Sequence, residues 1–136
     1  MLTIPLGVWS DAACMASPRR CTTRNAGSNP ASYVASPPVL GSTWTARVDL
    51  SLTGHTQAQV LGYAGPATVG LPGGQVVLVG GAKIFSLPLM TVPATWSAPI
   101  PIDPSLVGQV LYTQAVHIDG VTPFALSNAQ DLLIGY

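Results

Sequence analysis

The side chains that could carry acid–base chemistry are few, because the 136 residues contain two histidines, five aspartates and no glutamate. His117 precedes Asp119 by two residues, and a histidine oriented by a carboxylate is part of a Ser–His–Asp hydrolase site. The sequence lacks a G-x-S-x-G nucleophile motif, and His55 lies in a turn-like stretch of glycine and threonine. We expect His117 to be a surface residue at a strand end, so a hydrolase is the least favoured function.

The aspartates are too far apart in the sequence for a short metal-binding loop. Such a calcium loop collects several oxygen ligands within about twelve residues, and here no two aspartates lie closer than twelve residues. Asp49 fits an outward strand position, Asp103 a helix cap and Asp119 a turn, which leaves few carboxylates for glycoside cleavage. Glycine patterns that bind phosphates or dinucleotides are absent. The sequence predicts no catalytic residue, no metal site and no cofactor, and leaves open only a calcium site assembled from separate loops.

The two cysteines, Cys14 and Cys21, lie close together in a loop-like stretch. A disulfide between them would close a short loop and stabilise the fold by about 2.5 kcal/mol in the chain-entropy model. A CxxC motif is absent, and the histidines are too distant in sequence for a standard zinc spacing. We expect a structural disulfide in an oxidising compartment, with two free thiols as the alternative.

Aromatic side chains are the candidates for ligand binding, because tryptophan and tyrosine rings on many β-sandwich modules stack against sugars. Trp44 alternates with buried positions, so we assign it to the core. Trp96 lies between two proline-flanked turns and is the better surface candidate, with Tyr63 as a second one. These two residues support a carbohydrate-binding module as the alternative function.

The composition indicates an all-β fold. Charged residues make up 7% of the chain, against about 25% in an ordinary soluble protein, and the net charge is zero. The zero net charge argues against nucleic acids as partners, since phosphate binding needs a basic surplus. The stretch Met1–Trp9 lacks the basic start of a signal peptide. No run of about 20 mostly apolar residues is present, so the chain is not expected to span a membrane.

Within Ser42–Leu52, polar and apolar residues alternate from Thr43 onward, so the apolar side chains recur with a period of two. The second long predicted strand is Gln109–Ile118. This period of two is typical of strands in an antiparallel sheet. With the shorter strand-like segments between them, the pattern predicts eight or nine strands with turns every eight to twelve residues. We expect an antiparallel two-sheet β-sandwich, Ig-like or jelly-roll-like, with its core in residues 31–136. Residues 1–30, an apolar strand and a cysteine-containing loop, are assigned to the same domain.

Glycine and proline pairs divide the predicted strands. Gly65-Pro66 is expected to end the strand that begins at Gln57, and Gly80-Gly81 to separate Gln75–Val79 from Lys83–Thr91. In Asp103–Gly108, an aspartate cap, a proline at the first helical position and a closing glycine predict one helical turn.

One set of motifs runs along the chain: the pattern P-I-P-x-D-P-x-L-x-G, followed by Y-x-Q-A and later L-S-N. The stretches that carry it or accompany it are Asn25–Ala31, Pro38–Leu50, Pro99–Gly108, Val110–Val116 and Ala125–Ile134. Together they resemble a β-sandwich domain common in secreted planctomycete proteins, and the resemblance covers about residues 20–136. Such domains often have a cysteine after a glycine in the middle strand, where this chain has Gly74-Gln75.

The resemblance implies an exported module, extracellular or at the cell surface, with no assigned catalysis and no functional residues to carry over. Our leading hypothesis is a non-catalytic structural or interaction module that associates with copies of itself or with another cell-surface protein. The nearly uncharged surface lowers the repulsion that opposes association. An apolar segment at the N-terminus could pair with a sheet edge; its apolar residues are Leu2, Ile4, Leu6, Val8 and Trp9.

Overall fold

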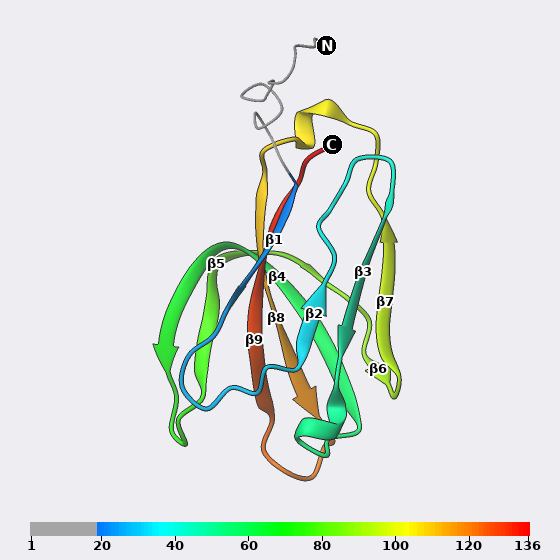
Figure 1. The fold of residues 1–136 in the computed structure, drawn as a ribbon. Coiled ribbons are helices and arrows are strands. Elements are labelled where there is room, and N and C mark those ends of the chain that lie inside the picture. Colours follow the sequence, from blue (N-terminus) through cyan, green and yellow to red (C-terminus); the bar gives the residue numbers. More distant parts are fainter. Residues whose placement is uncertain (1–18) are drawn as a thin grey trace, which may run out of the picture.

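The fold is an antiparallel β-sandwich, seen here in a computed structural model that describes residues 19–136 (Figure 1). Nine strands and two short 3₁₀ turns make up this part of the chain, in agreement with the predicted fold class. In chain order they are β1 (Arg20–Arg24), β2 (Tyr33–Ala35), β3 (Thr43–Val48), η2 (Leu50–Leu52), β4 (Gln57–Gly70), β5 (Val76–Ser86), β6 (Met90–Thr91), β7 (Ala94–Pro99), η3 (Pro104–Leu106), β8 (Val110–Ile118) and β9 (Ala125–Leu133).

The strands form one large and one small sheet. The large sheet has the order β1-β9-β8-β4-β5, with the short β6 added beside the start of β4. The small sheet has the order β2-β3-β7, and it packs across the large one (Figure 1). Every pairing between strands is antiparallel, as the alternating sequence pattern predicts.

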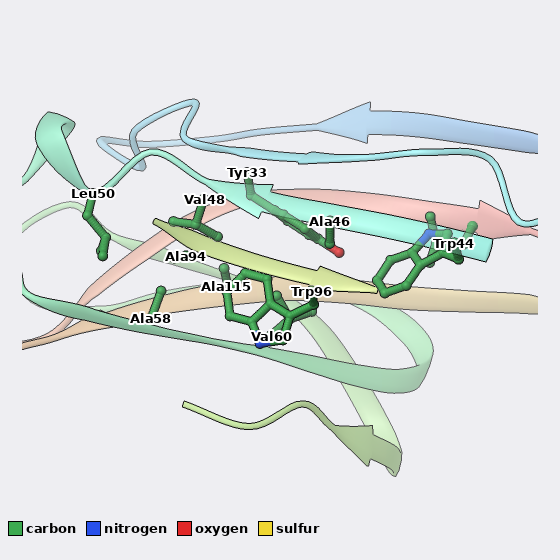
Figure 2. Close-up of a cluster of buried hydrophobic side chains, with 11 residues drawn as sticks. Tyr33, Trp44, Ala46, Val48, Leu50, Ala58, Val60, Ala94, Trp96 and Ala115 are labelled. Atoms are coloured by element: carbon green, nitrogen blue, oxygen red, sulfur yellow. The ribbon is translucent and has the colours of Figure 1, made fainter. Parts of the chain in front are cut away.

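The core lies between the two sheets, and β3 contributes one row of its side chains, including Trp44 as predicted. Trp44, Ala46 and Val48 point inward, and the residues between them are exposed. Figure 2 shows Trp44 at one end of this row of core side chains and Leu50 at the other. Strand β3 ends at Val48, and the carboxylate of the next residue, Asp49, accepts from the Ser51 N–H and caps η2. The predicted strand Ser42–Leu52 is therefore too long by one 3₁₀ turn.

The predicted strand ends at the glycine pairs are wrong, because β4 and β5 run through them as one long hairpin. Gly65-Pro66 lies inside β4, and Gly80-Gly81 lies inside β5, where Gly65 is paired with Gly80. The register shifts at these positions, so the glycines are β-bulges that bend two continuous strands instead of ending them. The bend is visible where β4 and β5 curve away from β8 in Figure 1.

Two further elements differ from their predicted bounds, and one agrees. The predicted loop before residue 30 contains β1, which pairs along its whole length with β9. Strand β9 is continuous over Ala125–Leu133, where the sequence predicts two segments, Phe124–Ser127 and Leu132–Gly135. The helical turn at η3 is confirmed: Asp103 accepts from the Ser105 N–H, and Gly108 has a φ of +89°.

Side-chain amides tie the elements together where no strand is available. Asn128 on β9 accepts from the Tyr33 N–H at 2.9 Å and donates to the Tyr33 carbonyl at 2.8 Å, which links the two sheets. Asn29 makes the same two-point contact with the backbone of Val76, at 2.9 and 2.8 Å. Gln114 accepts from the Leu78 N–H at 3.0 Å. These amides replace a neighbouring strand, because each offers one donor and one acceptor in the spacing of a peptide group.

Candidate functional site

Trp96, the main ligand-binding candidate, is buried, and this corrects the prediction that it lies on the surface. Only 6% of the residue is exposed, and its indole N–H donates to the Pro88 carbonyl at 2.8 Å. It points inward because it alternates in phase with Ala94 on β7. Tyr63 is half-buried on β4, in a small hollow of about 140 Å³ between the β4–β5 hairpin and β8. The structure therefore does not bring Trp96 and Tyr63 together as an aromatic platform.

His117 is also buried, which corrects its predicted place on the surface. Its ring bonds a hydroxyl at each nitrogen: Ser32 Oγ lies 2.7 Å from Nε2, and Thr53 Oγ1 lies 2.6 Å from Nδ1. The His55 ring packs edge-on against it at a centroid distance of 6.0 Å. These partners lie 64 and 85 residues away from His117 in sequence, so no local pattern could have revealed them. Asp119 instead accepts from the Val121 and Thr122 N–H groups of its own turn.

The environment of His117 keeps the imidazole neutral. Burial, and after it the neighbouring His55, lower the pKa of His117 to about 4 against an opposing effect of the Asp49 carboxylate. A neutral imidazole beside a serine Oγ has the geometry of a nucleophile and its base. Ser32 and His117 are only 2% and 0% exposed, however, and the third partner is a hydroxyl where a hydrolase has a carboxylate. This contact therefore joins the loop before β2 to β8 and to the loop after η2.

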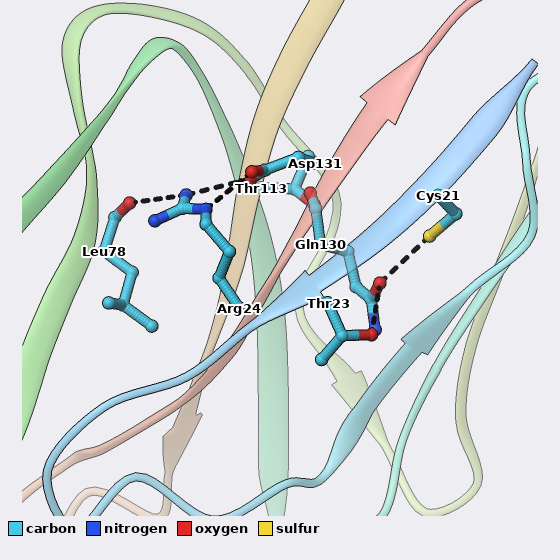
Figure 3. Close-up of polar contacts among 7 residues, drawn as sticks. All are labelled: Cys21, Thr23, Arg24, Leu78, Thr113, Gln130 and Asp131. Atoms are coloured by element: carbon cyan, nitrogen blue, oxygen red, sulfur yellow. Dashed lines mark hydrogen bonds and ion pairs between the residues drawn. The ribbon is translucent and has the colours of Figure 1, made fainter.

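Each aspartate of the described residues has a structural partner. Asp49, Asp103 and Asp119 accept from nearby N–H and hydroxyl groups, which holds the pKa of each carboxyl below its ordinary value. Asp131 on β9 forms a two-point ion pair with Arg24 on β1, which also donates to the Leu78 carbonyl (Figure 3). No three histidine, cysteine or acidic side chains within residues 19–136 lie close enough to hold a metal ion.

Cys21 lies half-buried at the edge between the two sheets. Its Sγ donates to Gln130 Oε1 at 3.0 Å, and Thr23 donates to the same oxygen at 3.2 Å (Figure 3). Burial raises the pKa of the Cys21 thiol to about 11. Cys14 lies outside the described residues, so its disulfide with Cys21 stays a prediction. The same holds for the predicted self-association residues, all of which precede residue 19: Leu2, Ile4, Leu6, Val8 and Trp9.

The outer face of the small sheet carries two adjoining hollows of about 420 Å³ each. One lies over the strands and is lined by Thr45, Thr95 and Ser97; the other lies at the loop end, between Ser51 and Val92. Arg47 lines both. We call this surface the Arg47 face. In the sequence, only the outward positions of β3 indicate it.

The outer edge of β7, beside the Arg47 face, is open. Strand β7 pairs only with β3, and no other strand of residues 19–136 lies on its far side. Its six residues, ATWSAP, include no charge, whereas charged side chains are one device by which natural sheet edges oppose pairing with another chain.

Residues 19–136 contain no helix of the length and hydrophobicity needed to cross a bilayer.

Comparisons with known proteins return no relative of this chain. No family model, no curated protein and no solved structure matches the sequence or the fold. The resemblance to secreted planctomycete domains stays a prediction from motifs.

Proposed function

We propose that this chain is a non-catalytic, exported structural module that associates with copies of itself by adding a strand at the open edge of β7. The observation that carries the proposal is that β7 pairs with β3 on one side only, which leaves its other edge without a partner strand among residues 19–136. Its uncharged residues and the zero net charge of the chain remove most of the electrostatic repulsion between copies.

The free groups of the edge follow from the pairing of β7 with β3. The N–H of Ile100, just after β7, donates to the Ser42 carbonyl at 2.8 Å, so Ile100 faces β3. Successive residues of an antiparallel strand alternate between facing the partner and facing away. Ser97 and Pro99 therefore present their backbone groups outward, and the missing N–H of proline is tolerated at such a position. Thr95 N–H already donates to the Pro93 carbonyl. Within the part of the chain that the structure describes, Ser97 thus offers a backbone donor and acceptor without partners.

The incoming strand in this proposal is the N-terminal segment of another copy. Leu2, Ile4, Leu6 and Val8 alternate with other residues, which is the pattern of a strand that lays one apolar face on a surface. Strand addition takes its affinity from main-chain hydrogen bonds and its specificity from alternate side chains. The exposed Val92, near the start of β7, would lie beside such a strand.

Mass in solution tests this proposal, measured by light scattering over a concentration series. We expect the full chain to form multimers, and both Ser97→Pro and deletion of residues 1–10 to give monomers. Ser97→Pro removes an outward N–H that makes no hydrogen bond to β3, so the pairing of β7 with β3 is kept. The matched control Ser97→Ala retains this N–H and should form multimers like the wild type. A folded Ser97→Pro variant with unchanged mass would exclude the edge, and a monomeric full chain would exclude self-association altogether.

The two other functions have less support. The predicted carbohydrate-binding platform would need an exposed Trp96, but this residue is buried in the core. A hydrolase would need access to Ser32 and His117, which are closed off. Neither function is therefore favoured over strand addition.

A further inference from the structure

A row of polar and aromatic side chains crosses the outer face of the large sheet. Leu132 on β9 packs into the core, so its neighbour Asp131 points to the opposite, outer side of the sheet. Cross-strand pairing joins Asp131 to Thr22 on β1 and to Tyr112 on β8. Tyr112 is in turn paired with Tyr63 on β4. Directly opposed side chains in an antiparallel sheet lie about 5 Å apart, so these four residues form one continuous surface, which we call the tyrosine row.

A hollow of about 210 Å³ lies over this row, where β1, β9 and β8 run side by side. Part of its lining is open to solvent: Arg20 and Thr22 are exposed, and Val110 is 38% exposed. The remaining lining residues are half-buried: Tyr112, Asp131 and Leu133. The hollow therefore combines apolar and aromatic surface with a few polar groups, which is the usual composition of a small-molecule site.

Asp131 is held in position by Arg24 (Figure 3). The guanidinium donates to both oxygens of the carboxylate and to the Leu78 carbonyl. Its central carbon lies 5.9 Å from the centre of the Tyr112 ring, within the range of a cation–π contact. The Asp131 side chain is still 17% exposed, and each carboxylate oxygen has a second lone pair for a further donor. The carboxylate is therefore a charge-compensated acceptor at the side of the hollow.

Positive charge gathers around the tyrosine row, although the chain as a whole is neutral. Three of the five basic residues lie there: Arg20, Arg24 and Lys83, the exposed partner of Tyr63 on β5. Asp131 is the only aspartate of residues 19–136 on this face, because the other three form turns elsewhere, namely Asp49, Asp103 and Asp119. The only ion pair in this part of the chain is Arg24 with Asp131, so Arg20 and Lys83 have no carboxylate partner within it. The face is therefore suited to an anionic ligand.

We propose that the tyrosine row binds an acidic polysaccharide, one sugar ring of which lies in the hollow with its carboxylate beside Arg20. An apolar cavity of about 150 Å³ holds benzene, so the hollow has room for one six-membered sugar ring. The C–H face of the ring packs on Val110 and Tyr112, since tyrosine offers an apolar ring with a polar tip. The sugar hydroxyls donate to Asp131 and bond the Thr22 hydroxyl. An acidic peptide would match the basic side chains, but it brings neither these hydroxyls nor the apolar face of a sugar ring.

This site is independent of the proposed self-association and of the excluded platform at Trp96. It lies on the large sheet, whereas Trp96 and the open edge of β7 belong to the small sheet. One sheet then joins copies of the chain, while the other holds the polymer.

Calorimetric titration of the full chain tests the proposal with two carboxylate-bearing probes, oligogalacturonate and oligomannuronate. We expect at least one of them to bind. Its methyl ester keeps the sugar rings without the charge and should bind about tenfold more weakly, as expected for loss of a charge-assisted hydrogen bond. Poly-glutamate of matched charge should also bind about tenfold more weakly or less. The variant Ser97→Pro should bind the acidic probe like the wild type, which separates this result from self-association.

Two arginines allow a matched comparison, because Arg20 and Arg47 are both exposed but lie on different sheets. Arg20→Gln should weaken the acidic probe about tenfold, whereas Arg47→Gln removes the same charge and should change the affinity less than twofold. Tyr112→Leu removes the ring and should weaken the acidic probe and its methyl ester alike. If thermal unfolding shows that Tyr112→Leu does not fold, Thr22→Val changes an exposed position of the same hollow and should weaken binding severalfold.

Three results would overturn the proposal. The first is the absence of binding for both acidic probes. The second is an equal loss of affinity in Arg20→Gln and Arg47→Gln, which would reduce the interaction to unspecific charge attraction. The third is binding of poly-glutamate as tight as that of the polysaccharide, which would make this face a site for acidic peptides.

Discussion

His117 makes the stability of the fold depend on pH, because its imidazole is fully buried between Ser32 and Thr53. Both neighbours are neutral hydroxyls, and no carboxylate bonds the ring to stabilise a positive charge. The folded state therefore resists protonation, with the pKa of His117 lowered from 6.5 to about 4 by burial and by His55. In the unfolded chain the same residue takes up a proton at its ordinary pKa. Acidification thus favours the unfolded state.

The size of the effect follows from this difference in pKa. The contribution of His117 is fully present above pH 6.5 and is lost progressively as the pH falls toward 4, since only the unfolded chain binds the proton there. One pKa unit corresponds to about 1.4 kcal/mol. Between pH 7.5 and 4.5 the free energy of unfolding should therefore fall by about 2 to 3 kcal/mol. The aspartates add little in this window, because their ordinary pKa of 3.8 lies below it.

Urea unfolding at half-unit pH steps between 7.5 and 4.5 measures this dependence. The control His117→Gln keeps hydrogen-bonding capacity but cannot titrate, so it should be less stable at pH 7.5 and nearly flat across the range. His55→Gln leaves the buried imidazole in place and should keep most of the slope. Equal slopes for the wild type and His117→Gln would refute the reasoning, and so would a slope that disappears only in His55→Gln.

Two further predictions concern the backbone. Gly27→Ala should lower the free energy of unfolding by at least 2 kcal/mol, roughly the sum of left-handed strain and a steric clash, because its Cβ would lie 2.2 Å from the Gly74 carbonyl. The control Gly54→Ala has a similar positive φ but open space around it, so it should lose only about 1 kcal/mol in the same urea titration. Asn128→Ala should destabilise by about 3 kcal/mol, since it leaves the Tyr33 N–H unpaired, and amide exchange at Tyr33 should then accelerate; unchanged exchange would contradict this.

The sandwich could be predicted because local alternation reports which face of a strand is buried. Trp44, Ala46 and Val48 showed the inward face of β3 directly. The same rule places Trp96 on the inward face of β7, whereas the prolines on either side of it indicate surface turns. These prolines lie at the ends of the strand and do not expose Trp96, so alternation is the stronger signal at this position.

The glycine pairs and His117 could not be assigned from local sequence. Gly65-Pro66 has the composition of a turn, yet it lies opposite Gly80 in a bulged hairpin, and only the pairing across the hairpin distinguishes the two cases. His117 looks like any polar residue at a strand end. Its burial depends on Ser32 and Thr53, which approach it from distant parts of the chain.

The amide ties have a consequence for the conditions under which this fold persists. Asn29, Gln114 and Asn128 hold the β4–β5 hairpin and β2 in place through neutral groups. Dissolved ions weaken attraction between exposed charges over distances of about 10 Å at 0.1 M salt, but they have little effect on buried neutral contacts. Apart from the pair of Arg24 with Asp131, the attachment of these elements is therefore indifferent to ionic strength. The architecture should therefore be the same at high and at low ionic strength.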